Sequence, residues 1–470
     1  MDYKYIIINV YLNNMTLISS ISGIRGTVDG ENGSSLTPID IVKYTSAYGK
    51  WINKENTLKK SVVIARDGRI SGQSILPIVR STLISMGIDI IDLGLSSTPT
   101  TQIIVKKKIT DGGIILTASH NPKNWNALKL FNSKGEFLSQ LEIDEILQNL
   151  KHGSFIYKKE DDYGKIFKIS DAFKTHINEV IKLNLVKTDE IRKRRFKIVV
   201  DGINSSGGVL VPKMLRELNS EVIELNCIPD GNFAHNPEPL DQNLTKLKDL
   251  VIKEKADLGI AVDPDVDRLV FICENGKSFG EENTLVVCSD YVLSNEKGAT
   301  VSNMSSSMSL EIITKKHDCD YFSSRVGEIN VVEKMKEVKA VIGGEGNGGV
   351  IYPESHYGRD ALVGIGLFLS KLSISNMNAS ELLDLYPRFI MKKDKLKLNT
   401  KFSMTELKQI IKKKYNNSRI DYSDGVKIFF DESWLHVRKS NTEPIIRLYC
   451  ESKSLEECNY IIEEFQKLLD

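Results

Sequence analysis

The strongest constraint on the fold is a strand–loop–helix–strand pattern that occurs twice in the sequence. Residues 61–93 and 196–225 each contain two short apolar segments on either side of an amphipathic stretch, and in both copies an aspartate followed by glycine (Asp67 and Asp201) ends the first apolar segment. Two buried strands joined through one helix predict a parallel βαβ unit. A fainter copy over residues 299–322 gives three related α/β units in series, which indicates duplication.

The rest of the chain requires further domains. Its 470 residues exceed one ordinary core, since a domain holds ~100–200 residues. The last part mixes short strands with helices, one of them from Leu455, and this predicts a smaller α+β domain. We expect a loose or misassigned N-terminal extension and four domains, at residues 1–14, 15–160, 161–270, 271–380 and 381–470. Linkers are expected near residues 158–162, 270–285 and 375–386.

Charge and hydropathy exclude several classes of protein. The 63 basic and 62 acidic residues produce no global field that favours nucleic acid or an anionic membrane, so any anionic ligand must be recognised locally. Apolar runs such as residues 5–12 are far shorter than the ~20 residues of a membrane span, and the start of the chain lacks the features of a signal peptide. The six cysteines show no CxxC spacing, which predicts buried free thiols in a reducing cytoplasm.

Thr-Ala-Ser-His-Asn-Pro, residues 117–122, abruptly ends an apolar segment. Pro122 prevents the chain from continuing as strand or helix, so we expect a tight loop that exposes Ser119. A serine on a rigid turn beside His120, with Lys129 ten residues further on, is a candidate to carry a covalent group. For this motif alone, a polar turn after a buried strand is an equally favoured interpretation.

Asp263, Asp265 and Asp267 alternate within Asp-Pro-Asp-Val-Asp-Arg, between two apolar segments. The motif is therefore expected to be a loop where one strand ends and the next begins. Crowded carboxylates repel one another unless a cation is present, and Mg²⁺ accepts oxygen ligands while keeping positions free for a phosphate. An EF-hand is rejected because Arg268 stands where the calcium loop has glycine and because strands flank the motif. The motif predicts a magnesium site, with a solvated acidic turn as the weaker alternative.

Three further segments contain candidate ligand-binding side chains. In the glycine-rich residues 343–349, Glu345 and Asn347 are suited to vicinal hydroxyl groups, although the spacing matches neither a P-loop nor a dinucleotide-binding loop. Residues 438–447 combine two arginines with hydroxyl groups and loop amides, a set suited to a dianionic phosphate, with a hairpin turn as the alternative. Near the start, Arg25 lies in Ser-Gly-Ile-Arg-Gly, which is a site segment or only a turn.

Together these motifs resemble the α-D-phosphohexomutases, the superfamily of phosphoglucomutase, phosphomannomutase and phosphoglucosamine mutase. The resemblance extends from about Met15 to the C-terminus and includes TASHNP, DPDVDR, the GEGNGG loop and RKSNTEP in the order expected of the family. It implies an α/β, four-domain, heart-shaped molecule with three related α/β domains and a C-terminal α+β domain. One loop from each domain would meet in a central cleft.

The resemblance also implies roles for single residues. Ser119 would be the phosphoserine and would bind magnesium through a phosphoseryl oxygen, together with Asp263, Asp265 and Asp267. Lys129 and Arg25 would handle protons or stabilise charge, with Arg268 nearby and His120 supporting the loop. The sugar hydroxyls and the non-reacting phosphate would be held by Glu345, Asn347, Arg438, Ser440, Asn441, Thr442 and Arg447. A hexose 1,6-bisphosphate is the implied intermediate and activator.

Three places depart from the pattern of the family or select among its members. Asn347 and Gly349 replace the serine and histidine of the usual sugar loop, and Ala127 replaces a glycine after the serine loop. Glu328 follows a Val-Gly pair, where members that act on mannose phosphates tend to have histidine and phosphoglucosamine mutases an acidic residue. A carboxylate there is suited to a 2-ammonium group. The expected reaction is glucosamine 6-phosphate to glucosamine 1-phosphate, ahead of phosphomannomutase or phosphoglucomutase activity.

Two functions of other kinds stay open at this point. A non-catalytic sugar-phosphate sensor would keep the fold but would not need the serine, the three aspartates and the phosphate loop together. A magnesium-dependent phosphatase would hydrolyse the phosphoserine. The expected setting is the cytoplasm, as a monomer or homodimer, with a phosphosugar as partner and without nucleic acid or membrane.

Overall fold

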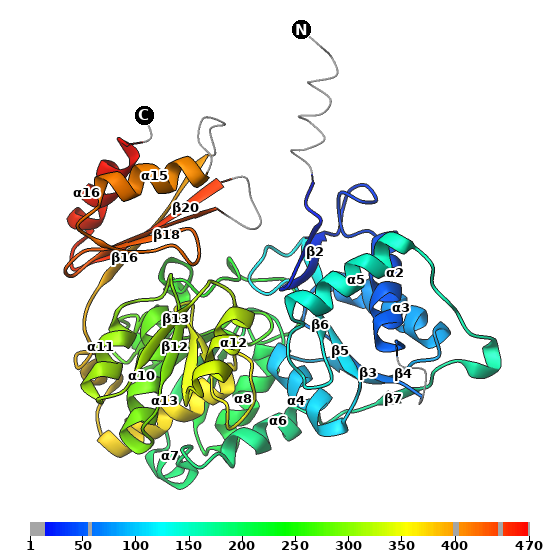
Figure 1. Cartoon of the computed structure of the whole chain (residues 1–470). Coiled ribbons are helices and arrows are strands. Elements are labelled where there is room, and N and C mark those ends of the chain that lie inside the picture. The colour runs from blue at the N-terminus through cyan, green and yellow to red at the C-terminus, as the bar shows by residue number, and fades with distance from the viewer. Residues whose placement is uncertain (1–14, 55–58, 398–403, 440–444, 469–470) are drawn as a thin grey trace. The chain divides into compact units, whose positions relative to one another are not determined.

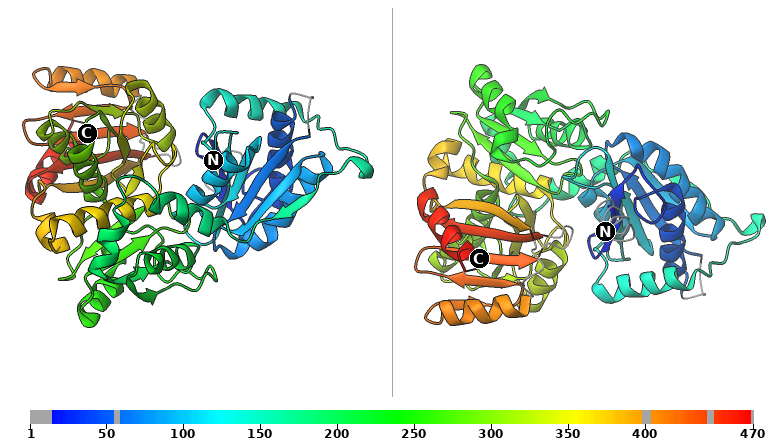
Figure 2. Two further views of the ribbon diagram at one scale, coloured as in Figure 1. Left: turned by 90° about the horizontal axis from the view of Figure 1, so that it is seen from below. Right: turned by 90° about the horizontal axis from the view of Figure 1, so that it is seen from above.

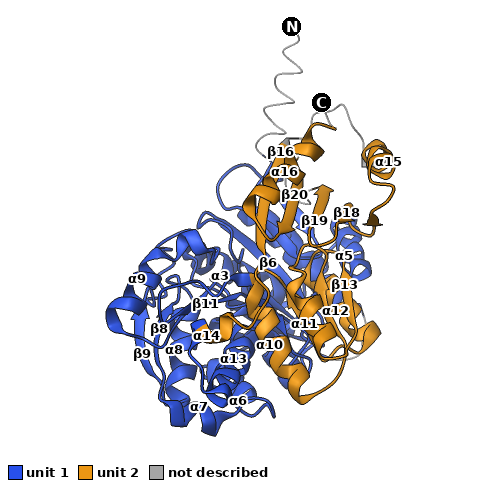
Figure 3. Ribbon diagram, turned by 90° about the vertical axis from the view of Figure 1, so that its left-hand side faces the viewer, with its two compact units in different colours: residues 1–281, 349–380 blue, residues 282–348, 381–470 orange. Residues whose placement is uncertain are grey.

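The computed structural model describes residues 15–54, 59–397, 404–439 and 445–468 (Figure 1). The chain forms two compact units, which Figure 3 colours separately. Unit 1 consists of Met1–Glu281 and Gly349–Ser380, and unit 2 of Glu282–Gly348 and Glu381–Asp470. Mixed sheets with covering helices and an antiparallel C-terminal sheet confirm the predicted fold class of three α/β domains and one α+β domain.

The first sheet of unit 1 has the strand order β1-β2-β6-β5-β3-β4-β7. Its strands are β1 (Ile18–Ser20), β2 (Gly23–Thr27), β3 (Ser61–Arg66), β4 (Asp89–Leu95), β5 (Gly112–Leu116), β6 (Trp125–Phe131) and β7 (Ile166–Lys168). β3 pairs in parallel with β4 and β5, whereas β6 is antiparallel to β5 and β2. The predicted parallel unit over residues 61–93 is thus confirmed.

Helices cover both faces of this sheet (Figures 1 and 2). One face carries α2 (Pro38–Ile52), α3 (Ile70–Ser85) and α5 (Gln140–His152), and the other carries α4 (Thr98–Lys108) and α6 (Ala172–Ile181). The side chains of β3 alternate accordingly: Val62 and Ile64 pack in the first layer, Val63 and Ala65 in the second. The parallel strands β3 and β5 end at the same edge of the sheet, so the loops after Arg66 and Leu116 lie together.

The second sheet of unit 1 has the order β11-β10-β8-β9. Its strands are β8 (Lys197–Asp201), β9 (Glu221–Leu225), β10 (Leu258–Val262) and β11 (Leu269–Cys273), and the nearby helices are α7 (Thr188–Arg194), α8 (Gly207–Glu217), α9 (Thr245–Glu254) and, after β15 (Gly349–Ile351), α13 (Ala361–Ser375). β8 and β9 are parallel, as predicted for residues 196–225. The linker expected from residue 270 is wrong in its first part, because all five residues of β11 are buried in the sheet. The linker expected over residues 375–386 likewise contains a helix, α14 (Ala379–Leu383).

Unit 2 combines a set of parallel strands and an antiparallel sheet. The first contains β12 (Thr300–Asn303), which pairs with β13 (Tyr321–Ser324) and β14 (Ile342–Glu345), with α10 (Glu281–Asn295), α11 (Ser309–Lys316) and α12 (Glu328–Val338). The second has the order β16-β20-β19-β18-β17. Its elements are β16 (Ile390–Lys397), β17 (Arg419–Asp421), β18 (Val426–Phe429), β19 (Trp434–Lys439), β20 (Ile445–Ser452), α15 (Met404–Lys414) and α16 (Leu455–Gln466).

The cysteines are free, as predicted, but not all are buried. Cys273, Cys288, Cys450 and Cys458 are buried, whereas Cys227 and Cys319, which lie in loops next to β9 and β13, are partly exposed. Within the described part of the chain, no helix has both the length and the apolar composition required to cross a membrane.

One lysine is buried inside unit 2. Lys427 of β18 is only 6% exposed. Its Nζ donates to the carbonyl oxygen of Met304 at 2.7 Å and lies 3.8 Å from the ring centroid of Trp434. Burial lowers the pKa of Lys427 from the ordinary 10.5 to about 8, although Glu451 opposes the shift. Between these two values the unfolded chain therefore binds more protons than the folded chain.

We expect the free energy of unfolding of the wild type to rise, relative to Lys427→Met, as the pH increases from about 8 to 10.5. Only the wild-type protein loses an unfavourably buried charge in this window, and the gain is on the order of 3 kcal/mol at ~1.4 kcal/mol per pKa unit. Guanidinium denaturation of the wild type and Lys427→Met at several values across this pH window measures the difference in their free energies of unfolding. Lys413→Met, on the exposed face of α15, is the control. Parallel pH curves for the wild type and Lys427→Met would contradict this account.

Candidate active site

Ser119 lies in the loop between β5 and β6 of unit 1. Its φ of +48° is left-handed, a conformation that costs free energy for a serine and that is often found at functional sites. Its N–H donates to Oγ1 of Thr117 at 3.0 Å, and its hydroxyl donates to Oδ2 of Asp263 at 2.7 Å. The predicted tight loop is confirmed, but the expected exposure is wrong. Ser119 is only 4% exposed, because the aspartate loop packs directly against its hydroxyl.

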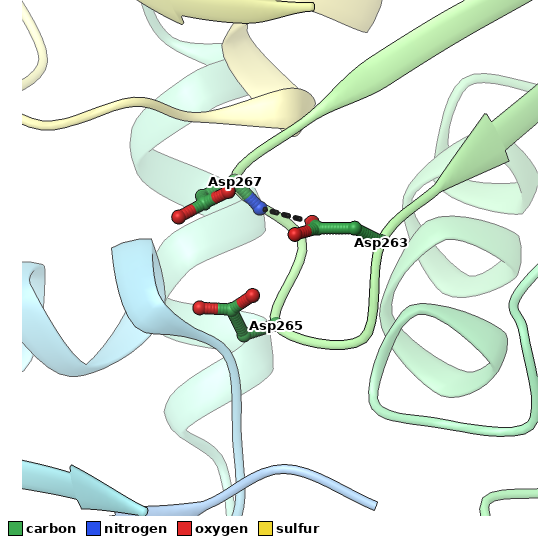
Figure 4. Close-up of side chains that lie close together, drawn as sticks. All are labelled: Asp263, Asp265 and Asp267. Atoms are coloured by element: carbon green, nitrogen blue, oxygen red, sulfur yellow. Dashed lines mark hydrogen bonds between the residues drawn. The ribbon is translucent and has the colours of Figure 1, made fainter. Parts of the chain in front are cut away.

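The three aspartates lie on the loop that joins β10 to the antiparallel β11, as predicted. Figure 4 shows their carboxylates gathered around one turn of the chain, and one ligand oxygen from each lies within 4.8 Å of the others. Two backbone N–H groups, of Asp267 and Arg268, donate to Oδ1 of Asp263 at 3.0 and 3.1 Å. Val266 at the tip has φ of +63°, so a β-branched residue is held in a strained conformation that brings its neighbours together.

This set of donors fits a hard divalent cation. All three carboxylates are fully buried, and within the described residues Oδ1 of Asp265 and Oδ1 of Asp267 have no hydrogen-bond partner. Burial, followed by repulsion from Asp267 and Asp265, raises the pKa of Asp263 well above its ordinary value. Oxygen donors at this spacing are the ligands that Mg²⁺ prefers, and a cation would relieve the repulsion.

Two basic side chains of unit 1 already balance part of this negative charge. Nζ of Lys129, on β6, lies 2.6 Å from Oδ2 of Asp265 and 3.3 Å from Oδ2 of Asp267. The guanidinium of Arg359 donates to Oδ2 of Asp267 at 2.7 Å. Burial opposes the charge on Lys129, but attraction to Asp265 and Asp267 outweighs it and raises the pKa of Lys129. Lys129 is therefore an ammonium group at neutral pH in this arrangement.

His120 and Arg268 also lie beside Ser119. Arg268 donates to Nδ1 of His120 at 2.8 Å and to Glu238 at 2.8 Å. Nδ1 of His120, which is 3.5 Å from Oγ of Ser119, accepts that bond and therefore carries no proton. Burial and the charges of Arg268 and Arg25 hold the pKa of His120 well below its usual range. The imidazole is thus a neutral support of the loop.

Arg25 reaches the same loop from β2. Its guanidinium donates to Oδ1 of Asn121 and to the carbonyl oxygen of Ser22, both at 3.3 Å. Burial lowers the pKa of Arg25, although the aspartates, Asp265 foremost, oppose the shift. The predicted residues Ser119, His120, Arg25, Lys129 and Arg268 and the three aspartates therefore belong to one connected site in unit 1.

Within unit 2, the predicted sugar-binding residues are also connected. Oε1 of Glu345, at the end of β14, accepts hydrogen bonds from Nδ2 of Asn303 at 2.8 Å and from the N–H of Gly327 at 3.1 Å. Asn347 lies 3.4 Å from Oε2 of the same carboxylate. Glu328, which begins α12, follows Gly327 directly and is 8% exposed. The structure therefore brings the Val-Gly-Glu segment and the glycine-rich loop together.

The two arginines predicted to bind phosphate are cross-strand neighbours. Arg438 on β19 pairs in register with Arg447 on β20, so both side chains project from the same face of the sheet. Arg438 is 3.4 Å from a carboxylate oxygen of Asp424, and Arg447 is 3.3 Å from the hydroxyl of Tyr449. Neighbouring guanidinium groups of this kind suit a doubly charged anion. The other predicted members of this loop, Ser440, Asn441 and Thr442, lie outside the described residues.

Three residues of the site are absent from the predicted set. For Arg359 the sequence contains one signal, an Arg-Asp pair directly before a largely apolar helix. The hydroxyl of Thr98 donates to Oδ2 of Asp265 at 2.5 Å. In the sequence, Thr98 is typical of the start of a helix, and nothing there indicates a role in the site. Arg69 follows the repeated Asp-Gly pair and donates to the serine loop, although its sequence position indicates only the start of α3.

We expect Lys129→Met to bind Mg²⁺ at least ~10-fold more tightly than the wild type, because the ammonium group competes with a cation for Asp265 and Asp267. Without a divalent ion the variant should melt at a lower temperature, since buried like charges lose their counter-charge. Calorimetric titration with MgCl₂ and melting curves with and without the ion measure both effects. The exposed Lys134→Met is the control. Unchanged or weaker binding by Lys129→Met would contradict the proposed competition.

Comparison with known proteins shows the family to which the chain belongs. Four models of the phosphoglucomutase/phosphomannomutase family match in order: α/β/α domain I at residues 18–156, domain II at 173–276, domain III at 281–389 and the C-terminal domain at 394–468. A phosphoglucomutase/phosphomannomutase of Thermococcus kodakarensis is 36% identical over 95% of this chain and 97% of its own length. A phosphoglucosamine/phosphogalactosamine mutase of Sulfurisphaera tokodaii is 30% identical over 95% and 98%.

A solved structure shows the same fold. The crystal structure of a phosphoglucomutase/phosphomannomutase family protein from Burkholderia thailandensis has a TM-score of 0.82, at 24% identity, and the match covers 96% of this chain and 98% of that one. The resemblance inferred from the motifs is thereby confirmed. With all four family domains matched in order along its length, this chain belongs to the phosphoglucomutase/phosphomannomutase family and is a phosphohexomutase.

Proposed function

We propose that this phosphohexomutase interconverts glucosamine 6-phosphate and glucosamine 1-phosphate. The observation that carries the proposal is the buried Glu328, which stands next to the N–H group that binds Glu345. A carboxylate at a largely desolvated position favours a ligand ammonium group over a hydroxyl group, because the charge pair offsets the cost of burial. The name of the Sulfurisphaera relative, a phosphoglucosamine/phosphogalactosamine mutase, supports an amino sugar.

In the proposed reaction, Ser119 carries a phosphoryl group. The free hydroxyl oxygen of the hexose monophosphate bonds to phosphorus, the bond from phosphorus to Oγ of Ser119 breaks, and the hydroxyl proton is transferred, in the net reaction, to Oγ of Ser119. The product is a hexose 1,6-bisphosphate, which reorients and returns its other phosphoryl group to Ser119. No phosphate is consumed, so a bisphosphate that escapes must be replaced, and this makes a hexose 1,6-bisphosphate the activator.

Phosphoryl transfer depends mainly on alignment and on neutralisation of charge. We assign charge stabilisation to Lys129 and Arg268, because Lys129 is protonated and Arg268 is oriented by Glu238 and His120. Arg25 is assigned to charge stabilisation as well, because its guanidinium donates hydrogen bonds beside the serine loop and, being already protonated, cannot accept the proton of the attacking hydroxyl. His120 keeps the loop in place without taking the proton.

We propose Mg²⁺ as the ion of the aspartate loop. Asp263, Asp265 and Asp267 would hold it together with a phosphoseryl oxygen of Ser119, and the unpartnered Oδ1 atoms of Asp265 and Asp267 support this set within the described residues. The bound ion supplies positive charge to the phosphoryl group. The chain's own contribution is to keep the three carboxylates buried and close together beside hydrogen-bond donors, as Lys129 and Thr98 are for Asp265.

The remaining contacts with the substrate are proposed for unit 2. Glu345 and Asn347 would bind the sugar hydroxyls, and Arg438 and Arg447 the non-reacting phosphate, together with Ser440, Asn441 and Thr442 of the loop outside the described residues. Asn347 replaces the serine usual in the family, and its amide contact with Glu345 supports a role in orienting that carboxylate.

We propose four domains, at residues 15–160, 161–270, 271–380 and 381–470, each of which contains one of the four loops. Free cysteines throughout the chain suit a reaction in the reducing cytoplasm, with a monomer or homodimer as the working form. Phosphomannomutase or phosphoglucomutase activity is the second candidate, and the 36% identity to the Thermococcus phosphoglucomutase/phosphomannomutase favours it.

We expect kcat/KM to be higher for glucosamine 1-phosphate than for mannose 1-phosphate or glucose 1-phosphate, each with its bisphosphate activator. Glu328→Gln should lower kcat/KM for the amino sugar by ~10-fold or more, the worth of a charge-assisted hydrogen bond, and should change that for glucose 1-phosphate by less than ~3-fold. Coupled assays at neutral pH measure these ratios.

The matched control is Glu333→Gln, at an exposed position of the same helix α12. Much faster turnover of mannose 1-phosphate than of glucosamine 1-phosphate by the wild type would overturn the choice of substrate. An equal loss of kcat/KM for all three sugar phosphates in Glu328→Gln would show that Glu328 does not recognise the amino group.

A further inference from the structure

A single buried guanidinium fastens the serine loop. Arg69, at the start of α3, is fully buried, and its terminal nitrogens donate to four carbonyl oxygens of that loop. The distances are 2.5 Å to Ser119, 2.7 Å to Asn121, 2.6 Å to Pro122 and 3.0 Å to Trp125. The contacts therefore span the loop from its strained residue to the first residue of β6.

Asp67 completes this support from the other side. Its Oδ2 accepts bonds from Nε of Arg69 at 3.1 Å and from the hydroxyl of Thr117 at 2.7 Å. The same hydroxyl oxygen of Thr117 accepts the N–H of Ser119 at 3.0 Å. Both the N–H and the carbonyl group of Ser119 are thus connected to the pair formed by Asp67 and Arg69.

Gly68, which lies between Asp67 and Arg69, is connected to the aspartate loop through Ser205. The N–H of Gly68 donates to Oγ of Ser205 at 2.9 Å, and that hydroxyl donates to the carbonyl oxygen of Pro264 at 2.7 Å. Pro264 lies between Asp263 and Asp265. A Cβ atom on Gly68 would come within 2.7 Å of the Cα atom of Ser205, so this close approach requires glycine. The turn formed by residues 67–69 is therefore connected to both loops, directly to the serine loop and through Ser205 to the aspartate loop.

We propose that Arg69 is a positioning residue that holds Ser119 in its left-handed conformation, at a fixed distance from the aspartate loop, through every phosphoryl transfer. The inference rests on the proposed phosphoserine role of Ser119. A left-handed serine costs on the order of 1–3 kcal/mol, and four loop carbonyl groups need donors where water is excluded. Only a planar guanidinium offers enough N–H groups in fixed directions, so lysine cannot replace Arg69.

The test compares Arg69→Lys with the wild type. Lysine keeps the charge opposite Asp67, so the variant retains the buried ion pair, but it loses most of the carbonyl contacts. We expect kcat to fall ~100-fold, the cost of misplacing a reacting group, with KM within ~3-fold because Arg69 touches no substrate. Melting curves and circular dichroism check the fold. Arg80→Lys, on the same helix and paired with Asp92, is the matched control.

A second variant keeps the test decisive if Arg69→Lys fails to fold. Thr117→Val removes the hydroxyl between Asp67 and the N–H of Ser119 without changing the shape of the side chain, and kcat should fall ~10-fold at unchanged KM. Folded variants with kcat within ~3-fold of the wild type, or with a raised KM at unchanged kcat, would overturn the role of Arg69. Mass spectrometry of the wild-type protein distinguishes failure of the positioning role from failure of the phosphoserine role. If Ser119 carries no phosphate, the phosphoserine role is refuted. If the wild type is phosphorylated and the variants are fully active, only the positioning role of Arg69 is refuted.

Discussion

Three buried carboxylates within 4.8 Å of one another are the interaction on which unit 1 depends. Carboxylates that are taken out of water at this spacing need positive charge and hydrogen-bond donors. The chain supplies these from separate elements: Lys129 from β6, Arg359 from the segment before α13, and the hydroxyl of Ser119 from the loop after β5. The aspartate loop is stable only where these groups converge. The packing of the α/β layers that brings them together therefore also assembles the site.

The contacts between the serine loop and the aspartate loop also make both loops rigid. Ser119 and Val266 both have left-handed backbones, and they stand in two loops that the hydrogen bond from Ser119 to Asp263 connects. Strain of this kind persists only where the surroundings over-determine the conformation. Here the turn at residues 67–69 binds the serine loop directly and is connected to the aspartate loop through Ser205. A phosphoryl group that must leave and return to one oxygen benefits from a loop that does not relax between the two steps.

Local signals in the sequence predicted the elements and the loops that follow them, and residue-level chemistry identified Ser119 and the three aspartates. Continuous apolar segments mark β3 and β10 because both faces of those strands are buried. Contacts between distant segments were harder to predict. The burial of Ser119, the pairing of Arg438 with Arg447 and the reach of Arg69 depend on register and on loop packing, which no short window of sequence contains. The expected linker from residue 270 failed because it overlapped the strand that the apolar segment after Arg268 itself predicts.

The most direct measurement follows the phosphoryl group itself. Enzyme carrying a radiolabelled phosphate on Ser119 is mixed with excess unlabelled glucosamine 6-phosphate and quenched at successive times. The account predicts that the label leaves the protein for a hexose bisphosphate, appears next in hexose monophosphates and never appears in quantity as inorganic phosphate. Ser119→Ala should accept no label and turn over no substrate. Release of the label as inorganic phosphate, or full turnover by Ser119→Ala, would contradict the account.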